Sequence, residues 1–171
     1  MKTIKAKWIL LLLIIVFGSF GIIMLLHSKA SENGSDTVRN DYREQELKRA
    51  LERGMNDLDG FTISLSFVSE KGCILVYSNQ TPQTCEYGRD YYLYRYNETK
   101  GWEPVDFIRD EVVYMDALLL KSGEEIKISR DFEYRYGKLA PGKYLHLVSI
   151  STTTDRKTYT EYYYGNEFEI P

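Results

Sequence analysis

The chain has 171 residues and a formal net charge of −3, with 22 basic against 25 acidic side chains. That balance argues against a nucleic-acid partner, because nucleic-acid-binding proteins usually show a basic excess or a basic stripe. The length suits one compact domain with appended segments. Tyrosine is enriched, at 15 residues, and it favours β-strands because its ring fits a pleated, half-buried surface.

The N-terminus has the composition of a membrane anchor. Residues 1–7 are rich in lysine and precede the uncharged apolar stretch Trp8–Leu26. At about 1.5 Å per residue this stretch nearly spans a hydrocarbon core of about 30 Å, whereas a cleaved signal has an apolar region of only about 7–15 residues. We therefore expect a retained, single-pass transmembrane helix in the cell membrane, with cleavage after Ala30 as the alternative. The positive-inside rule keeps residues 1–7 in the cytoplasm and places the C-terminal domain outside.

Residues 27–57 are expected to link this anchor to the domain. Residues 28–37 are polar and show no apolar period, as in a flexible spacer. Residues 41–53 carry acidic side chains early and basic side chains late and are followed by Gly54, an arrangement that favours a helix. We expect a short stalk helix at about 41–53, with a solvated linker as the alternative.

From Leu58 to Pro171 the pattern changes to the period of β-strands. Residues 61–67 alternate apolar and polar side chains, which is typical of a half-buried strand. Turn-forming segments separate about seven such strands, at residues 61–67, 73–78, 91–97, 112–120 (with a bulge near Asp116), 125–132, 144–150 and 158–170 (interrupted at Gly165). Their number and spacing predict an all-β, Ig-like sandwich of two antiparallel sheets.

The segment before the predicted sixth strand suits the crossover between the sheets of an Ig-type sandwich. There, a tyrosine near the start of the penultimate strand hydrogen-bonds back to the backbone a few residues upstream. Tyr144 is placed to be this corner tyrosine, after a turn at Pro141 and Gly142, and Leu139 would fill the core. The alternative is an ordinary Pro-Gly hairpin followed by a surface tyrosine.

Two further features of the domain each have two interpretations. Cys73 and Cys85 either form a disulfide, which contributes ~3 kcal/mol in the chain-entropy model, or remain buried free thiols. Tyrosines on the third and last predicted strands either form an aromatic contact surface for carbohydrate or peptide or stabilise the sheet as cross-strand pairs. The candidates for the contact surface are Tyr92, Tyr94, Tyr162 and Tyr164.

Motifs for catalysis or metal binding are missing from the sequence. The two histidines, His27 and His146, are not in a metal-binding spacing, and there is no Cys-x-x-Cys, acidic calcium loop, Gly-x-Ser-x-Gly or phosphate-binding loop. We therefore expect no metal, no cofactor and no enzymatic activity.

Several short motifs resemble those of one family. They are Asn79 after the second strand, Tyr87-Gly88 before the third, Gly101-Trp102 after a hairpin turn, the Tyr-Gly-x-Leu-x-Pro-Gly-x-Tyr block from Tyr136 to Tyr144, and the terminal Phe168–Ile170. With them, residues 60–170 resemble the bacterial Ig-like domain of many Gram-positive surface proteins. The resemblance implies an extracytoplasmic module without established catalytic residues.

The function expected from these features is that of a membrane-anchored, non-catalytic Ig-like module that binds an envelope protein or a cell-wall component. The alternative is a structural spacer or an accessory subunit of a membrane complex. An enzyme is the least expected function, because it would need a cleft of converging polar groups that the sequence does not show.

Overall fold

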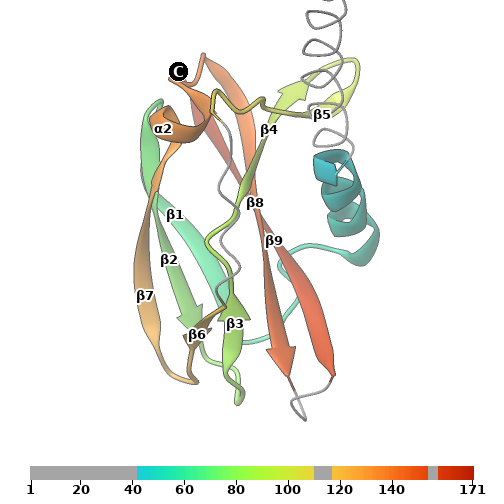
Figure 1. Ribbon diagram of the computed structural model, residues 1–171, viewed down its shortest axis with the longest axis vertical. Helices are drawn as coiled ribbons and strands as arrows, with labels where there is room; N and C mark the ends of the chain where they lie inside the picture. The colour runs from blue at the N-terminus through green and yellow to red at the C-terminus, as the bar shows by residue number, and fades with distance from the viewer. Residues whose placement is uncertain (1–41, 110–116, 154–157) are drawn as a thin grey trace, which may run out of the picture. The chain divides into compact units, whose positions relative to one another are not determined.

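The computed structural model describes residues 42–109, 117–153 and 158–171, and Arg43–Pro171 form one compact unit (Figure 1). The predicted cytoplasmic segment 1–7, the predicted anchor Trp8–Leu26 and the predicted bulge near Asp116 lie outside the described residues. Within the described residues, no helix has the length and apolar character needed to cross a membrane. The described elements are a helix at residues 42–53, then β1 (Phe61–Ser69), β2 (Gly72–Asn79), β3 (Cys85–Tyr87), β4 (Tyr92–Asn97), β5 (Gly101–Pro104), β6 (Leu118–Leu120), β7 (Glu125–Asp131), α2 (Phe132–Tyr136), β8 (Gly142–Thr153) and β9 (Tyr159–Ile170).

The strands form the predicted sandwich of two antiparallel sheets. One sheet has the order β1-β2-β7, and the other has the order β5-β4-β8-β3-β6 with β9 on the free side of β8. Strands β4 and β3 pair with successive parts of β8, so together they behave as one interrupted strand. The all-β, Ig-like fold class is therefore confirmed for the described residues, with about nine strands in place of seven.

The extra elements arise where the sequence departs from regular alternation. The predicted third strand, 91–97, is β4 and begins one residue late, at Tyr92, whereas β3 is an additional short strand before it. The main-chain carbonyl of Tyr91 accepts from the Tyr136 hydroxyl at 3.0 Å. The predicted fifth strand ends one residue early, because the Asp131 carboxylate accepts from the Tyr134 N–H at 2.8 Å and caps α2. Strand β9 runs through Gly165 without the predicted interruption. An added Cβ there would lie 2.5 Å from the Met55 sulfur, so a larger residue would require the Met55 side chain to move. That glycine marks a close approach of two chain segments, not a break.

Aromatic side chains fill the space between the sheets. Tyr144, Phe132 and Phe168 stack with ring centroids 5.5–5.6 Å apart, and Tyr77 meets Tyr87 edge to face at 5.4 Å. Asn79 is the last residue of β2 and is buried. Its side-chain amide donates to the Leu120 and Gln83 carbonyls at 2.9 and 2.8 Å. Asn79 therefore holds the connection between the two sheets in place, and its bond to Leu120 is shielded from water.

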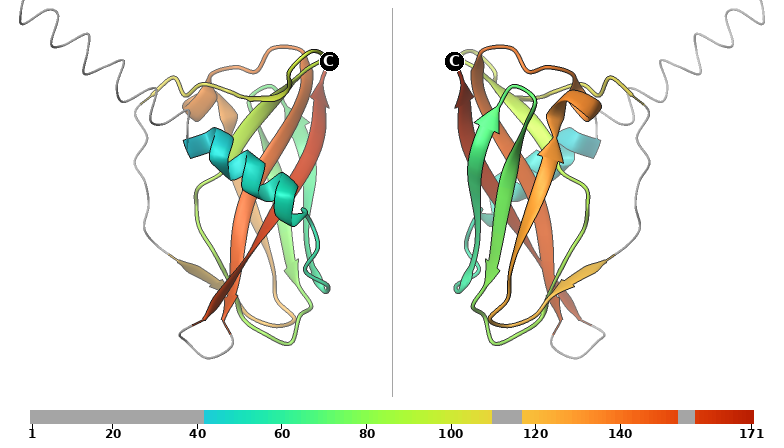
Figure 2. Two further views of the ribbon diagram at one scale, coloured as in Figure 1. Left: turned by 90° about the vertical axis from the view of Figure 1, so that its right-hand side faces the viewer. Right: turned by 90° about the vertical axis from the view of Figure 1, so that its left-hand side faces the viewer.

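The helix at residues 42–53 packs on the outer face of the six-stranded sheet, as Figure 2 (left) shows. Leu47 and Ala50 lie three residues apart on one face of this helix, and both are buried against side chains of β4, β8 and β9. The Tyr94 hydroxyl donates to the Arg43 carbonyl at 2.8 Å. The helix forms where we expected it but is docked, not a free stalk, so the compact unit begins at Arg43 and not near Leu58.

The crossover before β8 has the geometry of a tyrosine corner. The Tyr144 hydroxyl donates to the Ala140 carbonyl at 2.7 Å, and both Leu139 and Tyr144 are buried in the core. Gly142, which follows Pro141, has φ +151, a conformation that other residues rarely adopt. The chain therefore turns from α2 into β8 around a fixed hydroxyl–carbonyl contact.

Removing that hydroxyl tests the corner. Tyr144→Phe is expected to lower the free energy of unfolding by about 1 kcal/mol, because it removes one partly buried hydrogen bond and keeps the stacked ring. Urea unfolding measures this, with Tyr159→Phe, an exposed tyrosine at the far end of β9, as the control. Equal unfolding midpoints for the two variants would contradict a structural role of the hydroxyl.

Candidate interaction surface

The four tyrosines proposed as a contact surface do not form one. Tyr94 is buried under the helix, and Tyr164 is buried between the sheets, where its hydroxyl lies 3.2 Å from the Phe61 carbonyl. Tyr92 packs on the helix side and Tyr162 on the core side, and both are partly buried. Of the two interpretations of these tyrosines, a contact surface is wrong for Tyr94 and Tyr164, because the docked helix covers the first and the second sheet covers the other.

A different aromatic pair, an exposed Tyr96 and a partly buried Trp102, lies at the β4–β5 hairpin. Tyr96 and Trp102 lie directly opposite each other in the strand register, with their rings edge to face at 5.2 Å. The Lys143 ammonium of β8 lies 5.6 Å from the Tyr96 ring centre and 5.5 Å from the Trp102 ring centre. Tyr96 is 45% exposed. We call Tyr96, Trp102 and Lys143 the aromatic patch.

Neighbouring ion pairs and a tight turn hold the patch in shape. The Asn97 carboxamide oxygen accepts from the Thr99 N–H and hydroxyl at 2.9 and 2.7 Å, and Gly101 takes φ +80 to close the turn. Glu167 pairs with Lys143 at 2.5 Å, and this hydrogen bond raises the pKa of the lysine, so its ammonium stays charged. The patch therefore presents two aromatic rings and a fixed cation to one partner.

Parts of this patch were readable in the sequence. Alternation places Tyr96 on the same face as Tyr92 and Tyr94, and the Gly101-Trp102 motif marks the return strand of the hairpin. The position of Lys143 could not be predicted from its neighbours in the sequence, because only the pairing of β8 with β4 brings it beside the two rings. What alternation could not show is that the helix covers Tyr94 and leaves Tyr96 open.

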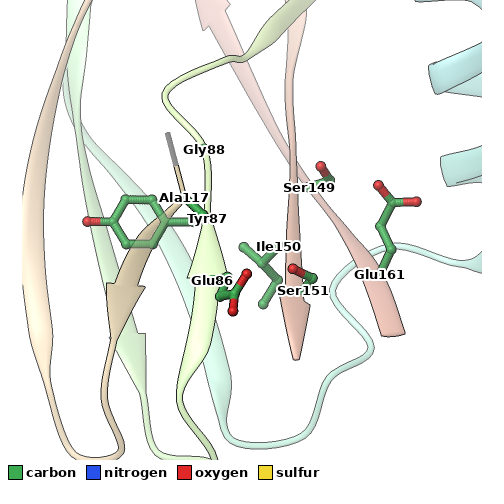
Figure 3. Close-up of a pocket in the computed structure, with 8 residues that line it drawn as sticks. All are labelled: Glu86, Tyr87, Gly88, Ala117, Ser149, Ile150, Ser151 and Glu161. Atoms are coloured by element: carbon green, nitrogen blue, oxygen red, sulfur yellow. The ribbon is translucent and has the colours of Figure 1, made fainter. Parts of the chain in front are cut away.

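The same outer face has a shallow pocket at the other end of the sheet. It has a volume of about 210 Å³ and is lined by Glu86, Tyr87, Gly88, Ala117, Ser149, Ile150, Ser151 and Glu161. Figure 3 shows the carboxylates and hydroxyls on one side of the strands and the Tyr87 ring pointing the other way, toward the core. Successive residues of β3 and β8 therefore divide between pocket and core, as the period of a strand requires.

The pocket is lined mainly by polar side chains, and few of them are available to bind a ligand strongly. Glu161 is already engaged, since it lies 3.1 Å from the Arg53 guanidinium and accepts from the Tyr163 hydroxyl at 3.0 Å. The lining has no histidine, lysine or cysteine to activate Ser149 or Ser151. The pocket offers hydrogen-bond partners for a hydroxyl or an amine, but its lining lacks the arrangement of an acyl-transfer site.

A cluster of cationic and aromatic side chains lies inside the sandwich and is not a surface site. The Tyr91 ring stacks on His146 at 5.1 Å, and the Arg130 and Arg135 guanidinium carbons lie 4.8 and 4.6 Å from its centre. His146 is fully buried. Burial first, and then the positive charge of Arg130, lowers the pKa of His146 to about 3, so the imidazole is neutral at pH 7.

Both cysteines are free thiols, the second of the two alternatives. Cys73 lies near the α2 end of β2, opposite Arg130, whereas Cys85 belongs to the other sheet, opposite Leu120. Both are buried in the core between the sheets. Their places in different sheets, at different ends of the sandwich, explain why they are not bridged.

The thiols are expected to resist alkylation in the folded protein. Burial raises the pKa of Cys73 to about 12 and also raises that of Cys85, so neither forms much of the reactive thiolate near pH 8. Mass spectrometry after iodoacetamide treatment at pH 8 should show no adduct in buffer and two adducts in concentrated urea without reductant. Two adducts only after reduction would instead reveal a disulfide.

The sheet order and the tyrosine corner together define an Ig-like sandwich domain. Residues 61–169 match the family model described as Bacterial Ig-like domain, and the chain belongs to this family. No curated protein matches the chain in sequence.

Proposed function

We propose that this protein is a membrane-anchored, extracytoplasmic interaction module that binds a protein or cell-wall partner and catalyses no reaction. Its family is the first support, because an Ig-like domain of bacteria suggests a surface-type binding module. The apolar stretch Trp8–Leu26 supports the anchor, with the domain outside the cytoplasm. The observation that carries the binding role is the aromatic patch, which stays open while Tyr94 on the same face is covered.

The composition of the patch suits an energetic centre of an interface. Tryptophan and tyrosine dominate such centres because they bury much surface at a small cost in side-chain entropy. The hairpin turn fixes Trp102 against Tyr96 before any partner arrives, so little ordering is required on binding. Truncation of a central aromatic typically costs about 2 kcal/mol or more, which corresponds to roughly a 30-fold loss of affinity.

The test compares a double variant of the patch with a single variant of an exposed tyrosine away from it, both in the full chain. The protein is extracted in mild detergent and used as bait for proteins and wall fragments of its own envelope. We expect Tyr96→Ser with Trp102→Ser to lower retention of the partner at least tenfold, and Tyr159→Ser, an exposed tyrosine away from the patch, to leave it unchanged. Equal retention by both variants would overturn the assignment of the patch.

The same variants separate this function from a structural spacer or accessory subunit. A spacer held by its membrane helix would keep its cellular role when the patch is changed and lose it when Trp8–Leu26 is deleted. An interaction module would lose its role in both cases.

A further inference from the structure

One end of the sandwich exposes an unusual set of large apolar side chains. Phe67 is 84% exposed, Tyr134 is 62% exposed and Ile108 is 57% exposed. They belong to the end of β1, to α2 and to the segment after β5. We call these three residues the apolar end.

Phe67 is held in a conformation that a bulky residue rarely adopts. Its φ is +50, in the left-handed region, at an irregularity in the pairing of β1 with β2 between Ser66 and Ser69. A bulge of this kind redirects a side chain, and the strain is tolerated only when the surrounding structure imposes it. Here the strained backbone directs an aromatic ring into solvent, where it makes no contribution to the core.

Backbone contacts join the three segments into one surface. The N–H groups of Phe132 and Glu133 donate to the Lys71 carbonyl at 2.8 and 3.0 Å, which ties α2 to the β1–β2 hairpin. The Ile108 N–H donates to the Arg135 carbonyl at 3.0 Å, which ties the segment after β5 to α2. Figures 1 and 2 show the hairpin and α2 at the same end of the sandwich, near the C-terminus.

Two ion pairs flank this end, and the Arg109 guanidinium lies 4.6 Å from the centre of the Tyr134 ring. Lys71 lies 3.4 Å from Glu133, and Lys138 lies 3.2 Å from Glu70. A rim of paired charges gives no strong attraction to a partner of either sign. It does suit the zwitterionic headgroup region of a bilayer, where aromatic and apolar side chains insert between headgroups.

The chain enters the compact unit at this end. Arg43 donates to the Val105 carbonyl, pairs with Asp106 at 3.1 Å and covers the Phe107 ring at 4.7 Å. Phe107 in turn packs on Tyr136 of α2, with ring centres 5.1 Å apart. Residues 27–42 separate this entry point from Leu26 in the sequence, and about 16 residues reach at most roughly 53–58 Å.

We propose that the apolar end rests on the outer surface of the lipid bilayer, with the Phe67 ring inserted among the headgroups. This inference rests on the proposed membrane anchor, which would keep the apolar end within reach of the lipid. In this contact the exposed Phe67 ring would be buried among lipid headgroups, whereas within the domain it does not contribute to the core. It also orients the domain, so that the aromatic patch on the adjacent sheet face is presented to partners close to the membrane.

Spin labelling of the full chain in phosphatidylcholine vesicles tests this contact. One nitroxide is attached through Glu133→Cys beside the apolar end and another through Lys121→Cys, at the opposite end of β7, and the buried native thiols stay unlabelled. We expect the label at 133 to collide with a water-soluble nickel complex several-fold less often, and with oxygen more often, than the label at 121. Phe67→Ser with Ile108→Ser should return the 133 label to the value at 121, since both side chains are exposed and the fold does not need them.

Two results would overturn the proposal, and flotation of the vesicles tells them apart. If the protein floats with the vesicles and the two labels are equally accessible to nickel, the anchor stands and the lipid contact is refuted. If the protein does not float, the membrane anchor itself fails, and the lipid contact that depends on it fails with it.

Discussion

A chain that starts at Leu58 is expected to be less stable than one that starts at Tyr42 by about 3–6 kcal/mol. The shorter chain lacks Leu47 and Ala50, so the apolar side chains of the sheet beneath them, among them Tyr94 and Leu147, become exposed to water. The shorter chain also loses the hydrogen bond that the Asn56 N–H donates to the Tyr163 carbonyl of β9 at 2.8 Å. Burial of one leucine contributes about 1.5–3 kcal/mol, and the remaining helix contacts supply the rest.

Urea unfolding of the two chains measures this difference. Leu47→Ala in the longer chain is the matched control, and it should show about 2–3 kcal/mol of the loss without changing the backbone. The fully buried Ala50 would remain in this variant, so part of the helix contact would survive. Equal unfolding midpoints for the chains that start at Leu58 and Tyr42 would show that the helix contributes nothing to the domain.

The second large effect is a loss of stability in mild acid that depends on His146. The pKa of His146 is about 3 in the folded protein and about 6.5 in the unfolded chain. Below pH 6.5 the unfolded chain therefore binds a proton that the folded protein does not, and stability falls by about 1.4 kcal/mol per pH unit. At pH 4.5 this one residue should cost about 3 kcal/mol relative to pH 7.

His146→Leu separates this effect from the titration of carboxylates. Leucine has a similar size and stays neutral, so the variant should lose the His146 part of the pH dependence between pH 6.5 and 4.5. The measurement is the free energy of unfolding in urea at several pH values for both proteins. Parallel pH profiles would mean that His146 takes up its proton in the folded state, contrary to its complete burial against Tyr91.

Features with a local cause were predictable from the sequence. The alternation of residues 61–67 predicted β1, and the spacing of Leu139, Pro141 and Tyr144 predicted the crossover, because each pattern is set by neighbours along the chain. The short strands β3 and β5 were not predicted, since each has few residues and is defined by pairing with another strand. Local patterns therefore gave the sandwich but not the full number of strands.

Features with a tertiary cause were not predictable in the same way. The sequence predicted a helix at about 41–53, but nothing in it showed that Leu47 and Ala50 would cover Tyr94. The choice of Tyr94 and Tyr164 as contact residues failed for the same reason, since alternation assigns a residue to a face and not to water. The pairing of the exposed Tyr96 with the partly buried Trp102 became visible only once the helix was placed.

The proposed binding role is tested most directly by photo-crosslinking in the native envelope. A photoreactive amino acid in place of Lys100, two residues before Trp102 in the hairpin turn, removes the Lys100–Glu103 ion pair but keeps Tyr96, Trp102 and Lys143. The same amino acid in place of Lys121 serves as the control. We predict one discrete crosslinked product from position 100 that is absent from position 121 and is lost when Trp102→Ser is added. No product from position 100, or the same product from both positions, would contradict an interaction module that works through this patch.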